Sequence, residues 1–251
     1  MTKNCLRFCF FSLSVMFLMT LGLPAQARSE STNSGSTSQD RIVFQETFSP
    51  PGDDQPDDSS GAGSRDGLKC NQDQQPIRPI MPRRNYGLTL KERPSIFIYL
   101  PNTSARQMVL TFQDQTGNFY ERAFLPIPAR VGIVSITLPD DKLPLTVGKN
   151  YQWSLAIICG ETIQPDDPVF KGWVQRVARS LEIDRELESK STIEQAAWYG
   201  AKGYWYDMLE TMVQELRSHP NDAHVNALWR DLLESVGLNA IASEPLIVDN
   251  Q

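Results

Sequence analysis

Few side chains in this sequence are spaced for metal binding or catalysis. The two histidines, His219 and His224, lie five residues apart on either side of Pro220, so they do not share one turn of a helix. A zinc site takes three or four protein ligands, and no further histidine or cysteine lies beside this pair. We therefore predict no metal site and interpret both histidines as loop or helix-capping residues.

Two pairs of adjacent carboxylates are the other candidates for chemistry. Asp140 with Asp141, and Asp166 with Asp167, fall in predicted turns, where carboxylates can bind calcium or act as a general acid and base. Aspartate beside proline is also common in turns for conformational reasons, and we favour that interpretation. The sequence contains no GxSxG, HExxH or CxxC motif. We expect no catalytic residue and no cofactor.

Basic and aromatic side chains each gather in one stretch. Residues 78–93 carry five Lys and Arg against Glu92 alone. This fits a basic edge strand or an anion-binding patch, but we prefer charges that are solvated or that protect a sheet edge from pairing. Residues 198–206 with Trp229 form a dense aromatic set. Such rings can stack on sugars or line a peptide groove, but their helical spacing favours an interface between helices and sheet.

Composition limits the classes of partner. The chain has 251 residues and a formal net charge of -6, from 24 Lys and Arg against 30 Asp and Glu. This balance gives no long-range attraction for nucleic acid or anionic lipid, so we expect neither as a partner. Hydrophobic residues make up 40% of the chain, which is enough for a packed core.

Residues 1–27 have the pattern of a secretory signal peptide. Two basic residues precede a mostly apolar run at 8–23, and small residues predict cleavage between Ala27 and Arg28. The run is shorter than the roughly 20 residues of a membrane span, which favours cleavage over anchoring. We therefore predict a mature extracytoplasmic protein, in the periplasm or secreted, with no integral membrane span.

The predicted cleavage leaves two of the four cysteines. Cys5 and Cys9 belong to the signal, and Cys70 and Cys159 remain. An even pair in an oxidising compartment predicts one disulfide. The bridge closes a loop of about 90 residues, which stabilises the fold by about 4–5 kcal/mol in the chain-entropy treatment. The alternative is two buried thiols that do not meet.

Residues 28–67 are predicted to be a disordered acidic linker. Seventeen of these 40 residues are Gly, Pro or Ser, and Asp is frequent, so the segment has little apolar surface to bury. The short apolar run at 42–44 is the part that can dock elsewhere on the protein.

Residues 68–177 show the alternation of β-strands and are predicted to form an antiparallel sandwich. We expect strands at 96–100, 108–112, 119–125, 133–138, 151–159 and 169–177, with a hairpin turn at 114–118. No segment of helical periodicity separates them, which excludes parallel βαβ units.

The run from Leu145 to Trp153 resembles the Leu-x-x-Gly-x-x-Tyr approach to a late strand in immunoglobulin-like and fibronectin-like sandwiches. In those folds the tyrosine hydroxyl, here that of Tyr151, bonds back to the preceding turn. The resemblance implies six or seven strands, with the Tyr151 strand in the core.

Residues 178–251 change to helical periodicity, with helices expected at 181–189, 192–200, 204–218 and 222–236. The second and third of these helices resemble one tetratricopeptide unit. Ala196 and Tyr199 match the first helix of such a unit, Gly203 the turn, Trp205 the aromatic position after it and Pro220 the end. One such unit cannot form a solenoid, so these helices must pack on each other, on the sandwich or on a partner.

Several blocks together resemble an uncharacterised cyanobacterial family, number nine hundred and twenty-eight of the domain-of-unknown-function series. The matching blocks are residues 94–101, 148–159, 172–177, 205–207 and 232–238. The likeness covers about 68–240 and implies a signal-bearing extracytoplasmic protein with no assigned activity.

These observations predict a β + α chain in which an immunoglobulin-like or fibronectin-like sandwich precedes a small tetratricopeptide-like helical module. We predict a non-catalytic envelope protein that mediates protein or peptide interaction. The alternative is a glycan- or small-ligand-binding protein that uses exposed aromatic side chains, and an enzyme is the least favoured reading.

Overall fold

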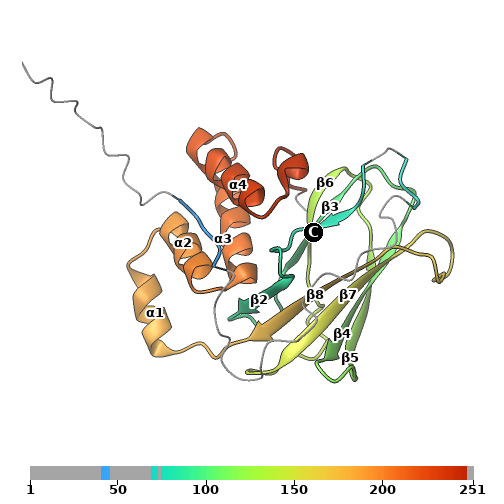
Figure 1. Cartoon of the computed structure of the whole chain (residues 1–251), viewed down its shortest axis with the longest axis horizontal. Helices are drawn as coiled ribbons and strands as arrows, with labels where there is room; N and C mark the ends of the chain where they lie inside the picture. Colours follow the sequence, from blue (N-terminus) through green and yellow to red (C-terminus); the bar gives the residue numbers. More distant parts are fainter. Residues whose placement is uncertain (1–40, 46–68, 73–74, 248–251) are drawn as a thin grey trace, which may run out of the picture. The chain divides into compact units, whose positions relative to one another are not determined.

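The computed structural model describes residues 41–45, 69–72 and 75–247, and all of these belong to one compact unit. The predicted signal peptide and its cleavage point at Ala27 and Arg28 lie outside the described residues, as does most of the predicted linker. The described chain is mixed β and α, with two sheets followed by four α-helices (Figure 1).

The smaller sheet has three antiparallel strands in the order β1-β3-β6. They are β1 (Arg78–Pro79), β3 (Ile96–Leu100) and β6 (Gly132–Ile136). All five side chains of the central strand β3 are buried, because both of its faces are covered.

The larger sheet has five strands in the order β2-β8-β7-β4-β5. They are β2 (Tyr86–Thr89), β8 (Val169–Arg176), β7 (Asn150–Ile158), β4 (Gln107–Asp114) and β5 (Phe119–Pro126). Three of the four pairings are antiparallel, but β2 runs parallel to β8, which corrects the purely antiparallel expectation. Five strands, rather than a crossover helix, lie between β2 and β8 in the sequence, so no βαβ unit is formed.

The six predicted strands are confirmed to within two residues, as is the hairpin turn between β4 and β5. In that turn the Asp114 carboxylate accepts hydrogen bonds from the backbone N–H groups of Thr116 and Asn118, both at 2.9 Å. Together with bonds from the Thr116 hydroxyl and the Asn118 amide, these bonds lower the pKa of Asp114 to about 2. Gly117 has a φ of 84°, which glycine adopts without strain.

Two strands were not predicted, and both lie in the basic stretch at 78–93. β1 and β2 are edge strands of their sheets, but β2 contains no basic residue and all four of its residues are buried. They are short, at two and four residues, and give little periodic signal.

Four α-helices follow the sheets, at nearly the predicted positions. They are α1 (Leu181–Glu188), α2 (Thr192–Ala201), α3 (Trp205–Ser218) and α4 (Ala223–Ser235), with a short 3-10 helix, η1 (Asn239–Ile241), after them. Ser191 and Glu194 form a capping box at the start of α2, and Asp222 caps α4. None of the described helices is long and apolar enough to cross a bilayer.

Covalent and local bonds fix the ends of β7. Cys70 and Cys159 form the predicted disulfide, with their Cα atoms 5.4 Å apart, and it ties the chain before β1 to the residue after β7. At the other end, the Tyr151 hydroxyl accepts a hydrogen bond of 3.3 Å from the backbone N–H of Thr146, the bond that the sequence motif predicts.

Candidate functional site

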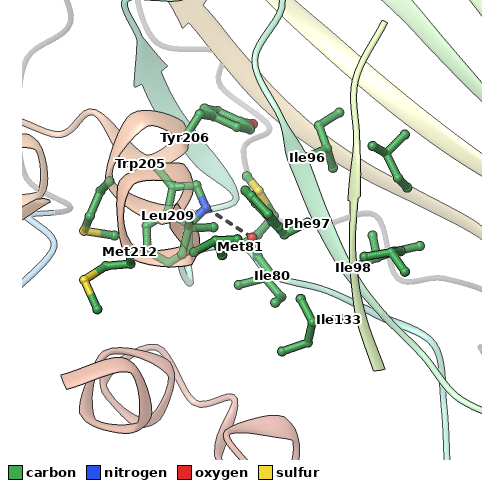
Figure 2. Packing of buried hydrophobic residues seen from close by; sticks show 14 of the residues in the cluster. Ile80, Met81, Ile96, Phe97, Ile98, Ile133, Trp205, Tyr206, Leu209 and Met212 are labelled. Atoms are coloured by element: carbon green, nitrogen blue, oxygen red, sulfur yellow. Dashed lines mark hydrogen bonds between the residues drawn. The ribbon is translucent and has the colours of Figure 1, made fainter. Parts of the chain in front are cut away.

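The N-terminal end of α3 packs directly on strand β2. A Cβ added at Gly87 would lie 2.4 Å from the Cβ of Trp205, so only glycine lets the helix approach this closely. The Trp205 side chain is fully buried, and its indole N–H donates a 3.1 Å hydrogen bond to the carbonyl of Ile80 (Figure 2). The hydrophobic cluster therefore runs from the sheets into the helices without a break.

Tyr206 joins the helix to two strands of the larger sheet. Its hydroxyl accepts a hydrogen bond from the indole N–H of Trp153 at 2.7 Å and donates one to the carbonyl of Trp173 at 2.9 Å. Burial raises the pKa of Tyr206 far above its usual range, so the hydroxyl remains a donor at any physiological pH.

Asp207 is a buried acid at the same end of α3. Only 4% of its surface is exposed, and its carboxylate accepts hydrogen bonds from the Leu90 N–H, at 3.1 Å, and from the Thr89 hydroxyl. Burial raises its pKa to about 6 despite these bonds. These bonds tie the first turn of α3 to the end of β2, so we assign Asp207 to positioning α3.

The C-terminal end of α3 is open, with a hollow on each side. The first, of about 600 Å³, lies where the edges of the two sheets approach, and its lining includes Met108, Leu125, Pro126, Val134, Ile136 and Arg217. The second, of about 620 Å³, lies between α3, α4 and the segment after η1. Its lining includes Leu216, Trp229, Ala242, Pro245, Leu246 and, again, Arg217. Both volumes fall in the range of ligand sites in proteins.

Arg217 lies at the junction of the two hollows, which we call the Arg217 groove. Its guanidinium donates one long hydrogen bond, 3.4 Å, to the carbonyl of Ile247. Among the described residues no carboxylate lies within ion-pair distance of it. Arg230 and Glu244 also line the second hollow, so the groove as a whole carries one excess positive charge. It suits an apolar ligand with an anionic group.

The segment Pro245–Ile247 forms a wall of the groove and is pinned to β6. The Ile133 N–H donates to the carbonyl of Pro245, and the Ile247 N–H donates to the carbonyl of Ile133, both at 2.8 Å. A Cβ at Gly132 would lie 2.3 Å from the Pro245 carbonyl oxygen, so this approach requires glycine. The groove is thus built from parts distant in sequence.

Residues 60–246 match the family model described as Domain of Unknown Function (DUF928), which covers most of the chain and the whole Arg217 groove. The chain belongs to this family. No characterised protein shows significant similarity to it.

Within this DUF928 domain the carboxylates of Asp166 and Asp167 make structural contacts, whereas the contact given for the pair Asp140 and Asp141 is to the backbone of Asp140. The Lys69 ammonium bonds the carboxylates of Asp166, at 2.7 Å, and Asp167, at 3.0 Å, and Asp167 also accepts from the Gln164 N–H. The carbonyl of Asp140 accepts a hydrogen bond from Arg93. Asp167 therefore fixes its own turn.

The two histidines of the DUF928 domain lie in different elements. His219 follows α3, with its Nδ1 3.0 Å from a carboxylate oxygen of Glu215, and His224 is in the first turn of α4. Among the described residues, no group of three His, Cys, Asp or Glu is arranged to hold a metal ion.

Most of the predicted aromatic set of the DUF928 domain is core. Tyr199, Tyr204 and Trp229 are buried, like Trp205 and Tyr206. Trp198 is half-buried; it stacks on Tyr204 with ring centroids 5.6 Å apart and donates to Glu186. The interface interpretation thus holds for Trp205, which packs on Gly87 of β2, and for Tyr206, which bonds β7 and β8.

Sequence reasoning did not identify Arg217 or Asp207. Arg217 has the sequence context of any exposed arginine on an amphipathic helix. Asp207 did carry a signal, because an acid between buried aromatic and apolar residues falls on the buried face of a helix.

Proposed function

We propose that this protein is a non-catalytic extracytoplasmic protein that binds a segment of another protein in the Arg217 groove. The observation that carries the proposal is a pair of hollows, one mainly apolar and one with a mixed lining that includes Ser135 and Thr137, which meet at an arginine with no carboxylate partner in the described chain. An extended segment with apolar side chains and one acidic group is the complementary ligand.

The proposed location follows from two features of the chain. The N-terminal pattern is that of a secretory signal, and the disulfide between Cys70 and Cys159 is of the kind that persists in oxidising compartments.

The proposed architecture is an immunoglobulin-like sandwich joined to one tetratricopeptide-like helix pair. The bond from Thr146 to the Tyr151 hydroxyl supports the first part. The second part is supported by the short turn at Gly203, which has a φ of 82°, and by the burial of Ala196 and Trp205 between the paired helices and their neighbours.

Charge reversal at Arg217 tests the proposal. The mature chain, an Arg217→Glu variant and an Arg185→Glu variant are each used to capture proteins from native envelope extract, with cross-linking. Arg185 is the matched control because it is also an exposed arginine in the last turn of a helix, α1. We expect a partner retained by the unmodified and Arg185→Glu proteins and lost from the Arg217→Glu protein. A partner retained equally by all three would exclude the groove as its binding site.

Point variants are preferable to removal of residues 178–251. Trp205 and Tyr206 are fully buried against the sheets, so deletion of the helices would expose the core and unfold the remainder.

Glycan binding through aromatic side chains is the second candidate. The stacked pair of Trp198 and Tyr204 is its best location, since Trp198 is the partly exposed member of the aromatic set. Tryptophan fluorescence titrated with cell-wall and polysaccharide fragments tests it, with Trp198→Phe as the comparison. A response that Trp198→Phe does not alter would exclude this pair.

A further inference from the structure

The segment Arg41–Gln45 lies in an extended conformation beside α2 and α3, where Figure 1 draws it in blue. Ile42 and Phe44 are buried, while Val43 between them is 49% exposed. The Phe44 ring packs edge-on against Trp205, with centroids 4.8 Å apart, and the Gln45 N–H donates to the carbonyl of Gly200 at 3.0 Å. The segment is thus held like a bound peptide, by alternate side chains and its backbone.

Gly200 makes room for the backbone of this segment. A Cβ at residue 200 would lie 2.7 Å from the carbonyl oxygen of Val43 and 2.8 Å from the sulfur of Met208. The flexible thioether of Met208 can move aside for such a Cβ. The carbonyl of Val43 is part of the backbone, so the segment itself would have to move away from α2. The face of α2 and α3 around Gly200 and Trp205, which we call the hairpin face, therefore selects an extended backbone at this point.

The attachment of the segment to this face is small. Two side chains are buried, and the ordering of five residues opposes the gain from their burial. The docked segment is part of the same chain, joined to Lys69 by residues 46–68, and this tether gives it a high local concentration at the hairpin face.

The hairpin face lies within the part of the chain that matches the family model, whereas the segment docked on it does not. The match to the family covers residues 60–246, which includes α2 and α3 but not residues 41–45. The hairpin face is therefore part of the shared domain, whereas the segment on it comes from outside that domain.

We propose that the hairpin face is a second binding surface, for an extended partner segment with two apolar side chains two residues apart, and that residues 41–45 occupy it until such a segment displaces them. The partner is expected to place a β-branched aliphatic side chain where Ile42 lies, an aromatic ring against Trp205, and a carbonyl opposite Gly200. This surface is separate from the Arg217 groove, so either proposal can fail alone.

A labelled synthetic peptide with the sequence of residues 39–47 is the probe. Its fluorescence anisotropy is measured with the mature chain and with an Ile42→Asp/Phe44→Asp variant, whose own segment cannot dock because both anchors are charged. We expect the variant to bind the peptide at least about ten-fold more tightly than the unmodified chain, in which the tethered segment competes. A peptide with aspartate at the same two positions should not bind.

A glycine variant then locates the binding. Gly200→Ala, added to the vacated chain, should weaken peptide binding at least about ten-fold, while alanine favours helix α2. Gly160→Ala is the matched control, because a Cβ there meets nothing within 4 Å, and it should leave binding unchanged. Circular dichroism verifies that each variant is folded.

Two results would overturn the proposal. One is a folded, vacated chain that does not bind the peptide, since the hairpin face would then hold its segment only as a structural part. The other is an unmodified chain that is dimeric by light scattering and becomes monomeric when Ile42 and Phe44 are replaced, since the occupant would then be the segment of a second copy.

Discussion

The two ends of helix α3 are built in opposite ways. At the N-terminal end, Trp205 and Tyr206 are buried, and their polar atoms bond Ile80, Trp153 and Trp173. At the C-terminal end, Arg217 is exposed between two hollows and makes one long hydrogen bond. One end is saturated with intramolecular bonds, and the other has capacity left for a ligand.

This difference separates positioning from binding. The close-packed contacts of Trp205 and Tyr206 with the sheets fix the direction of α3, and they thereby hold Arg217 at the other end of the helix in a fixed position. Variants that remove the bonds of Trp205 or Tyr206 should therefore lower stability, and variants at Arg217 should change binding in the Arg217 groove while leaving stability almost unaltered.

The largest effect is expected for Trp205→Ala. The change creates a cavity beside β2 and leaves the Ile80 carbonyl without its donor, so the free energy of unfolding should fall by about 3–5 kcal/mol. Urea denaturation followed by circular dichroism measures it. Trp198→Ala, at a half-buried ring on the neighbouring helix, is the control and should cost clearly less. If both variants lost the same free energy of unfolding, Trp205 would contribute no more to stability than the half-buried Trp198.

An intermediate effect, dependent on pH, is expected for Asp207→Asn. The pKa of Asp207 is raised in the folded protein, from 3.8 to about 6, so the folded state binds more protons than the unfolded state between these values. The contribution of Asp207 to stability is therefore greatest below about pH 4 and is lost as the pH rises through 6, a loss of about 3 kcal/mol.

Asparagine does not titrate and can still accept the hydrogen bond from Leu90. The difference in unfolding free energy between the two proteins should therefore change by about 2 kcal/mol between pH 4 and pH 7, in favour of the variant at pH 7. Asp231→Asn, at an exposed position on α4, is the matched control for the loss of one carboxylate. If Asp207→Asn changed the pH profile no more than Asp231→Asn, Asp207 would titrate normally in the folded protein.

The smallest effect on stability is expected for Arg217→Glu. An acidic residue in the last turn of a helix opposes the helix dipole, which costs under about 1 kcal/mol, and Arg185→Glu should cost the same in α1. Thermal and urea denaturation of the two variants compare them. A loss at Arg217 as large as that of Trp205→Ala would mean that both ends of α3 hold the fold, and the contrast between them would disappear.

Much of the fold is predictable from local pattern. The period-two alternation located strands such as β3 and β4, and the helical period with Ser, Thr and Asp caps located α1 to α4. Strand β2 was not predicted because Tyr86–Thr89 is short and contains glycine, and because it pairs in parallel with a strand more than 80 residues later. Gly87 is explained by its contact with Trp205, which no local pattern reveals.

The candidate site is less predictable than the fold, for the same physical reason. The disulfide followed from counting cysteines, since the predicted signal cleavage leaves only Cys70 and Cys159 to pair. The Arg217 groove is assembled from β4, β5, β6, α3, α4 and the segment after η1, and its shape depends on how these pack. The sequence around an exposed arginine does not indicate that residues of other elements form a hollow beside it.

The disulfide also has a mechanical consequence. The chain that leads into β1 carries Cys70, and Cys159 directly follows β7, the middle strand of the five-stranded sheet. Tension on that leading chain passes through the covalent bridge to β7 and bypasses β1, a strand of two residues that would otherwise peel away first. A force applied ahead of Cys70 is therefore transmitted to the middle of the five-stranded sheet.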